Sequence, residues 1–187
     1  LAAMALSRWQ GPFIAALGLI GSYVTPALIP SDDPNAWSFF PYLLVILVAS
    51  FATLRGRSWW WLGYAAVAGA GLWTALWIVG TFEPADVWPV GLFAHLLGFI
   101  AFYGLMGPAI LTPASGGFDE PKTITQPLVI GLFGLAVESG LLALLVDATA
   151  HGNIALFLLA AAVAGLLAIA WIKDGVAVLA PLGGLLL

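Results

Sequence analysis

The 187-residue sequence contains no cysteine and very little charge. Without cysteine the chain forms no disulfide, binds no metal through a thiolate and carries no cysteine nucleophile. Only 7% of its residues are charged and 63% are hydrophobic, whereas about a quarter of the residues in an ordinary soluble domain are charged. A soluble chain of this size keeps too much of its surface in water for such a composition. We therefore predict an integral membrane protein with the lipid bilayer as its main partner.

Basic residues are also scarce, with five in the whole chain. They are spread over short segments and form no basic stripe, so nucleic acid is not expected as a partner. The sequence has no P-loop, no Gly-x-Ser-x-Gly elbow, no His-Glu-x-x-His and no Gly-x-Gly-x-x-Gly. Their absence argues against the common nucleotide-using and metallohydrolase classes. We predict no catalytic, cofactor-binding or metal-binding residues and no cofactor.

Long hydrophobic runs recur along the chain. A transmembrane helix needs about 20 mostly apolar residues, and the short loops between the runs imply that neighbouring helices are antiparallel. Both ends of the sequence look truncated, so we expect a piece of a longer chain. The predicted fold is all-α, a single polytopic transmembrane bundle with complete spans over 9–29, 38–54, 59–82, 89–111, 127–146 and 153–172 and a partial span over 176–187.

The basic residues all fall on one side of the membrane when successive loops alternate between the two sides. Lys and Arg collect on the cytoplasmic side of membrane proteins. The N-terminus is therefore predicted to be cytoplasmic, and the protein to be a multi-pass component of a bacterial cytoplasmic (inner) membrane. The residues that carry this prediction are Arg8, Arg55, Arg57, Lys122 and Lys173.

Two ionisable residues lie inside the predicted spans. An ionisable side chain within the membrane is costly and marks a functional site by default. With a helical rise of about 1.5 Å per residue, His95 lies roughly 9 Å and Glu138 roughly 12 Å below the outer boundary. These depths allow contact if the helix rotations agree, and the pair is our candidate protonatable centre. The alternative is that both residues are neutral and hold helices in register.

The predicted outer loops are acidic. Acidic loops can form a vestibule that concentrates cations, although they also remain when basic residues are merely excluded from one side. Both interpretations stay open. The candidate vestibule residues are Asp32, Asp33, Glu83, Asp86 and Asp147.

Other features of the spans are expected to be structural. Trp73 and Trp77 lie one turn apart on one face, which predicts a packing ridge or a lipid-facing stripe, with a ligand platform as the alternative. Pro26 is expected to interrupt its helix near the end, where a kink is tolerated. Small residues spaced four apart, such as Ala94 and Gly98, favour close helix packing.

The first three predicted spans also contain segments that resemble those of a known protein family. The segments are 16–29 (Ala-Leu-Gly-Leu-Ile-Gly-Ser-Tyr-Val-Thr-Pro-Ala-Leu-Ile), Trp37 with 42–44, and 61–77, from Trp-Leu-Gly-Tyr to Leu-Trp-Thr-Ala-Leu-Trp. They resemble a family of large bacterial predicted membrane proteins of unknown function. The later spans agree with that family mainly in hydropathy. The resemblance implies a longer chain with more spans, and it implies no activity and no site residues.

Three classes of function fit these observations. The first is a transporter or permease-like protein that moves a small solute or ion and uses Glu138, with His95, as a protonatable centre. The second is a non-catalytic scaffold or accessory subunit, packed against other membrane subunits or further helices of the same chain. The third, an intramembrane enzyme acting on a lipid-linked envelope substrate, is less favoured. A water-accessible cavity at Glu138 favours transport, a sealed bundle favours a scaffold, and a polar cleft at the outer boundary favours an enzyme.

Overall fold

The computed structural model describes residues 11–28, 34–54, 59–111 and 126–172. Every regular element in these ranges is a helix, which confirms the predicted all-α fold. The elements are α2 (Pro12–Leu28), α3 (Ala36–Leu54), α4 (Trp60–Gly80), the short 3-10 helix η1 (Pro84–Asp86), α5 (Val87–Leu111), α6 (Gln126–Ala148) and α7 (Asn153–Ile172).

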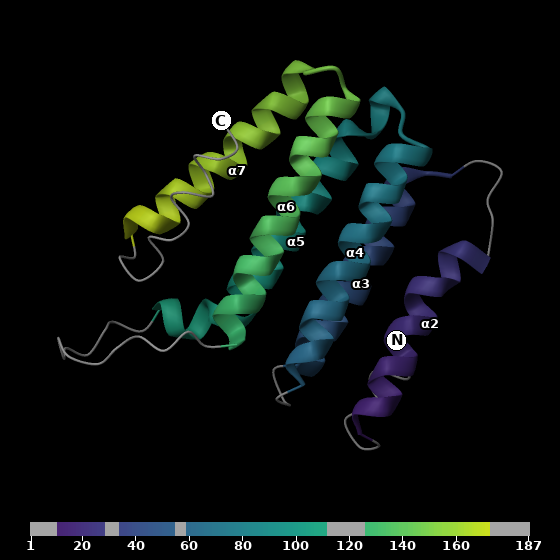
Figure 1. The fold of residues 1–187 in the computed structure, drawn as a ribbon, viewed down its shortest axis with the longest axis vertical. Helices are drawn as coiled ribbons and strands as arrows, with labels where there is room; N and C mark the ends of the chain where they lie inside the picture. The colour runs from purple at the N-terminus through teal and green to yellow at the C-terminus, as the bar shows by residue number, and fades with distance from the viewer. Residues whose placement is uncertain (1–10, 29–33, 55–58, 112–125, 173–187) are drawn as a thin grey trace.

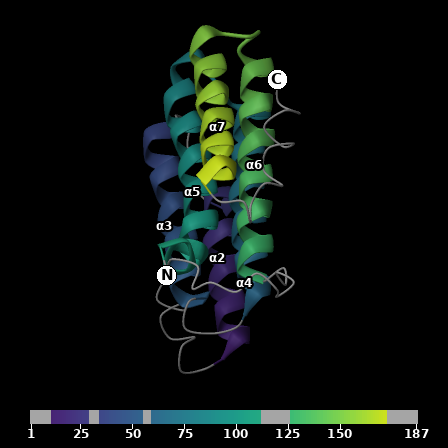
Figure 2. The ribbon, with the colours of Figure 1, turned by 90° about the vertical axis from the view of Figure 1, so that its left-hand side faces the viewer.

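The four central helices α3, α4, α5 and α6 pack in two layers, with α4 and α6 in front of α3 and α5 (Figure 1). Consecutive helices run in opposite directions, as the short connections require. Helix α2 flanks α3 and α4 at one edge of the bundle, and α7 lies against α6 and α5 at the other. Figure 2 shows the same helices from the α7 side, with α5 and α6 on either side of α7.

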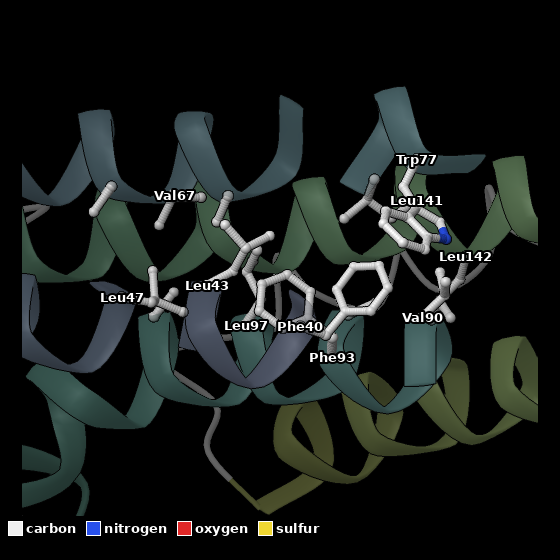
Figure 3. Close-up of a cluster of buried hydrophobic side chains, with 14 of the residues drawn as sticks. Phe40, Leu43, Leu47, Val67, Trp77, Val90, Phe93, Leu97, Leu141 and Leu142 are labelled. Carbon is white, nitrogen blue, oxygen red and sulfur yellow. The ribbon is translucent and has the colours of Figure 1, made fainter. Parts of the chain in front are cut away.

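The hydrophobic core lies between these two layers (Figure 3). Phe40 of α3 is its aromatic centre, because its ring centroid lies 5.6 Å from that of Trp77 and 5.2 Å from that of Phe93. Leu43, Leu97 and Leu142 are fully buried around it. The side chains that fill this core therefore come from all four central helices.

Four helices are long and apolar enough to cross a membrane: Ala36–Leu54, Trp60–Gly80, Pro84–Gly104 and Gln126–Ala148. Two shorter apolar helices, Pro12–Leu28 and Asn153–Ala168, flank them. Four of the predicted spans thus coincide with candidate membrane spans, while the count of six and the cytoplasmic N-terminus stay predictions. The partial span over 176–187 and the five basic residues lie outside the described ranges.

Candidate functional site

Glu138 and His95 are in contact. His95 lies on α5 and Glu138 on α6, and the imidazole Nδ1 is 2.7 Å from the carboxylate Oε1. Since α5 and α6 are antiparallel and pack closely along their lengths, residues at similar predicted depths become neighbours. The helix rotations, which the sequence left open, bring both side chains to the same interface.

A glycine makes room for the carboxylate. A Cβ atom on Gly98 would overlap the Oε2 atom of Glu138, and it would lie 2.7 Å from Cδ and 3.1 Å from Cβ of the same side chain. The carboxylate therefore rests on the backbone of α5 at a point where no other residue fits. Gly98 follows His95 by three positions and so shares its helix face.

Glu138 is deeply buried, whereas His95 lies at the rim of the interface. The Glu138 residue is 7% exposed, and 26% of the His95 side chain is exposed. Despite this, the His95 Nε2 atom is itself buried and has no hydrogen-bond partner in the described part of the chain. One turn earlier on α5, Gly91 packs against Leu158 of α7, which places His95 near the boundary between α5 and α7.

The geometry allows the pair to gain a proton without breaking its hydrogen bond. When a neutral His95 donates its Nδ1 proton to ionised Glu138, the pair has one negative charge and Nε2 holds a free lone pair. A proton added at Nε2 gives an imidazolium beside a carboxylate, with no net charge, and Nδ1 still donates to Oε1. Net charge within a membrane is costly. The protonated pair, which has no net charge, is therefore more stable in a dry, apolar environment than the deprotonated pair.

The acidic candidates are placed differently from one another. Asp86 lies in η1 and its Oδ2 accepts hydrogen bonds from the Trp77 indole Nε1 at 3.0 Å and from the Glu83 backbone N–H at 3.2 Å. This carboxylate thus fixes the turn between α4 and α5. Asp147 is exposed at the end of α6. Asp32 and Asp33 lie outside the described residues, and the vestibule stays a prediction.

Among the cavities lined by described residues are four that include neither Glu138 nor His95. One of about 570 Å³ lies between Pro84 and Val87 on one side and Thr149 and Asn153 on the other, so η1 lies beside the α6–α7 turn. Over the described ranges, no three His, Asp or Glu side chains group closely enough to hold a metal ion.

The sequence points to the two ionisable members of the pair, Glu138 and His95, but not to the role of Gly98. The signal was available as the Ala94–Gly98 pair of small residues, but the same spacing recurs by composition in a chain with 22 glycines. Only the rotation of α6 shows that this glycine faces a carboxylate and not a lipid chain or another methyl group.

Apolar helices of membrane-spanning length, packed around a buried carboxylate–imidazole pair, define an all-helical integral membrane protein. Over residues 1–187 the chain matches the family described as "Predicted membrane protein (DUF2339)", and it belongs to that family. This confirms the resemblance seen in the sequence. No curated protein and no solved structure matches the chain.

Proposed function

We propose that this protein is a proton-linked permease of a bacterial cytoplasmic membrane, in which Glu138 and His95 form the centre that takes up and releases the proton. The observation that carries the proposal is the 2.7 Å contact between Nδ1 and Oε1, together with the unpartnered Nε2 atom. Intramembrane ionisable residues that pair with one another are typical of proton relays in transporters.

The proposal requires that water reach Nε2 in at least one conformation. His95 lies near the α5–α7 boundary, where Gly91 packs against Leu158, and a quarter of its side chain is exposed there, 26%. A small separation of α7 from α5 at this boundary would admit water to the imidazole while Gly98 keeps the carboxylate in place. Protonation would then remove the net charge of the Glu138–His95 pair and favour the return of α7 to α5.

Infrared difference spectroscopy across pH tests this function on the protein in lipid vesicles. We expect a carboxylate band that shifts with bulk pH, because the donor to Oε1 changes from a neutral imidazole to an imidazolium. The band should disappear in Glu138→Gln and persist in Asp147→Asn. The second variant removes an exposed carboxylate at the end of the same helix, so it is a matched control. A Glu138 band that stays constant at every pH would contradict the proposal.

A second function, a membrane scaffold, is favoured by one observation. None of the four cavities reaches Glu138 or His95, as expected if the pair only joins α5 to α6. In that case both residues act as an interhelical hydrogen bond, which contributes about 0.6 kcal/mol on average in membrane proteins. The constant infrared band that contradicts the permease is the result that this alternative predicts.

A further inference from the structure

A second site lies at the opposite edge of the bundle, between α2, α3 and α4. It is a cavity of about 590 Å³, which falls within the range of roughly 300–1,000 Å³ found for small-molecule sites. It lies where α2 ends, α3 begins and α4 ends, at the upper right of the bundle in Figure 1. Its aromatic wall consists of Phe39, Tyr42, Trp73 and Trp77.

Pro26 lines this cavity and interrupts the backbone hydrogen bonds of α2. Proline has no backbone N–H, so it cannot donate to the carbonyl of the residue four positions earlier, and its ring bends the helix. In α2 that carbonyl belongs to Ser22, and it accepts a hydrogen bond of 2.7 Å from the Tyr42 hydroxyl of α3. The adjacent carbonyl of Tyr23 accepts one of 2.9 Å from the Trp73 indole of α4. Two aromatic donors, one from α3 and one from α4, thus hold α2 beside these helices.

The hydrogen-bond donors of the aromatic wall already have acceptors within the protein. Tyr42 and Trp73 donate to α2, and Trp77 donates to Asp86. The ring of Phe39 stacks on that of Trp77 with a centroid distance of 5.0 Å. Since these donors are engaged, the wall offers ring carbon to an occupant of the cavity.

Two threonine hydroxyls that line the cavity are engaged as well. Thr25 donates to the Gly21 carbonyl of α2 at 2.7 Å, and Thr81, directly after α4, donates to the Trp77 carbonyl at 3.3 Å. A polar solute would lose its hydrating water here and find few donors in return, which is unfavourable. A hydrocarbon chain that enters from the bilayer has no hydrating water and no hydrogen bonds to lose.

The mouth of the cavity has a different character. Asn35 and Ser38, at the start of α3, line it and are exposed, and they offer an amide and a hydroxyl as hydrogen-bond donors. Asp86 and Glu83 lie close by, because Asp86 bonds to the Trp77 indole of the cavity wall. No Lys or Arg occurs in the described ranges. An anionic headgroup would therefore meet carboxylates and no opposite charge.

We propose that this cavity binds one hydrocarbon chain of a membrane lipid whose head is zwitterionic or uncharged and lies at Asn35 and Ser38. The site makes Trp73 and Trp77 a ligand platform, and it is independent of the Glu138–His95 pair. Lipid occupancy would also explain how a space beside an interrupted helix stays filled in the membrane.

Native mass spectrometry tests this assignment. The protein is reconstituted in vesicles of phosphatidylethanolamine and phosphatidylglycerol in equal amounts, extracted in mild detergent and weighed with its retained lipid. We expect one retained phosphatidylethanolamine, which is lost in Leu76→Trp and in Thr25→Trp because each new indole fills the cavity from a different wall. Leu72→Trp is the matched control, since Leu72 is exposed one turn earlier on α4 and does not line the cavity.

Three results would overturn the proposal. Equal retention of lipid by the cavity-filling variants and by Leu72→Trp would show that the lipid binds elsewhere. Retention of phosphatidylglycerol as readily as phosphatidylethanolamine would remove the selectivity of the mouth. A dimer that both cavity-filling variants abolish, with bound lipid unchanged, would show that a second copy of the chain occupies this face.

Discussion

Glu138 is held by two residues of one neighbouring helix. His95 Nδ1 shares a hydrogen bond with Oε1, and Gly98 provides the space for Oε2. Because these residues are three apart on α5, they lie on the same face and act on the two oxygen atoms of one carboxylate. The site is therefore specified by a short segment of α5 and a single residue of α6.

Replacing Gly98 tests the space that the carboxylate occupies. We predict that Gly98→Ala lowers the free energy of unfolding by about 1–3 kcal/mol, as overpacking does in a well-packed interior. Gly140→Ala is the control, because a Cβ at Gly140 meets nothing within 4 Å and alanine favours a helix by about 1 kcal/mol over glycine. The measurement is unfolding in detergent micelles. Equal stability of the two variants would show that Glu138 does not rest on Gly98.

The hydrogen bond of the pair can be measured separately from its burial. In a double-mutant cycle of His95→Gln and Glu138→Gln, we predict a coupling energy of about 0.5–3 kcal/mol, the range for residues in contact. Glutamine keeps both side chains polar and avoids leaving a cavity. Additive effects of the two substitutions on unfolding would argue that the side chains do not interact in the membrane-solvated protein.

At the level of single residues, the sequence predicted which ionisable groups lie within the spans better than what they contact. Glu138 and His95 were recognisable because charge within a span is costly, and their depths followed from the helical rise. Their contact depends on the rotation of α6, which hydropathy does not encode. For Asp86 the sequence suggested a vestibule, which stays a prediction. The structure adds that Asp86 Oδ2 accepts hydrogen bonds from the Trp77 indole and the Glu83 N–H.

Helix α2 depends on its neighbours for two backbone hydrogen bonds. Pro26 leaves the Ser22 carbonyl without its helical donor, and Tyr42 supplies one from α3. A proline near the end of a short apolar helix was expected to be structural. The structure adds that the carbonyl it frees is satisfied by a tyrosine from another helix.

Because the Ser22 carbonyl depends on Tyr42, the effect of removing the Tyr42 hydroxyl should depend on whether Pro26 is present. In the natural sequence we expect Tyr42→Phe to cost about 0.5–1.5 kcal/mol of stability, because a partly buried acceptor loses its partner. In the Pro26→Ala background the cost should fall, since alanine at this position restores a backbone N–H donor to Ser22 within α2. Thermal unfolding of the four proteins measures both effects. The same cost in both backgrounds would contradict the pairing of Tyr42 with the proline.

Helix boundaries followed hydropathy closely, with deviations that local chemistry explains. Helix α3 begins at Ala36, two residues before the predicted span, because Asn35 precedes it and its Oδ1 accepts a 2.8 Å hydrogen bond from the Trp37 N–H. Helix α5 begins at Val87, although the predicted span starts at Pro89. Proline in the first turn is tolerated because the N–H groups there lack helical partners anyway.

For the whole molecule, the sidedness of the membrane is the prediction with most consequences. It rests on five basic residues outside the described ranges, so only accessibility measurements can test it. The cysteine-free sequence suits single-cysteine labelling without background. We predict that Asp147→Cys reacts with a membrane-impermeant maleimide in intact cells, while Lys122→Cys reacts only after permeabilisation. Labelling of both positions from the same side would refute the alternating arrangement of the spans.

The measurement that tests the protonatable pair most directly is solid-state ¹⁵N NMR of His95 in lipid. The chain has two histidines, so His151→Gln leaves a single imidazole. We predict one hydrogen-bonded Nδ1 signal that shifts when Glu138→Gln is added, and an Nε2 signal that reports proton uptake as the pH falls. An imidazole spectrum that does not respond to Glu138→Gln and does not change with pH would contradict the account.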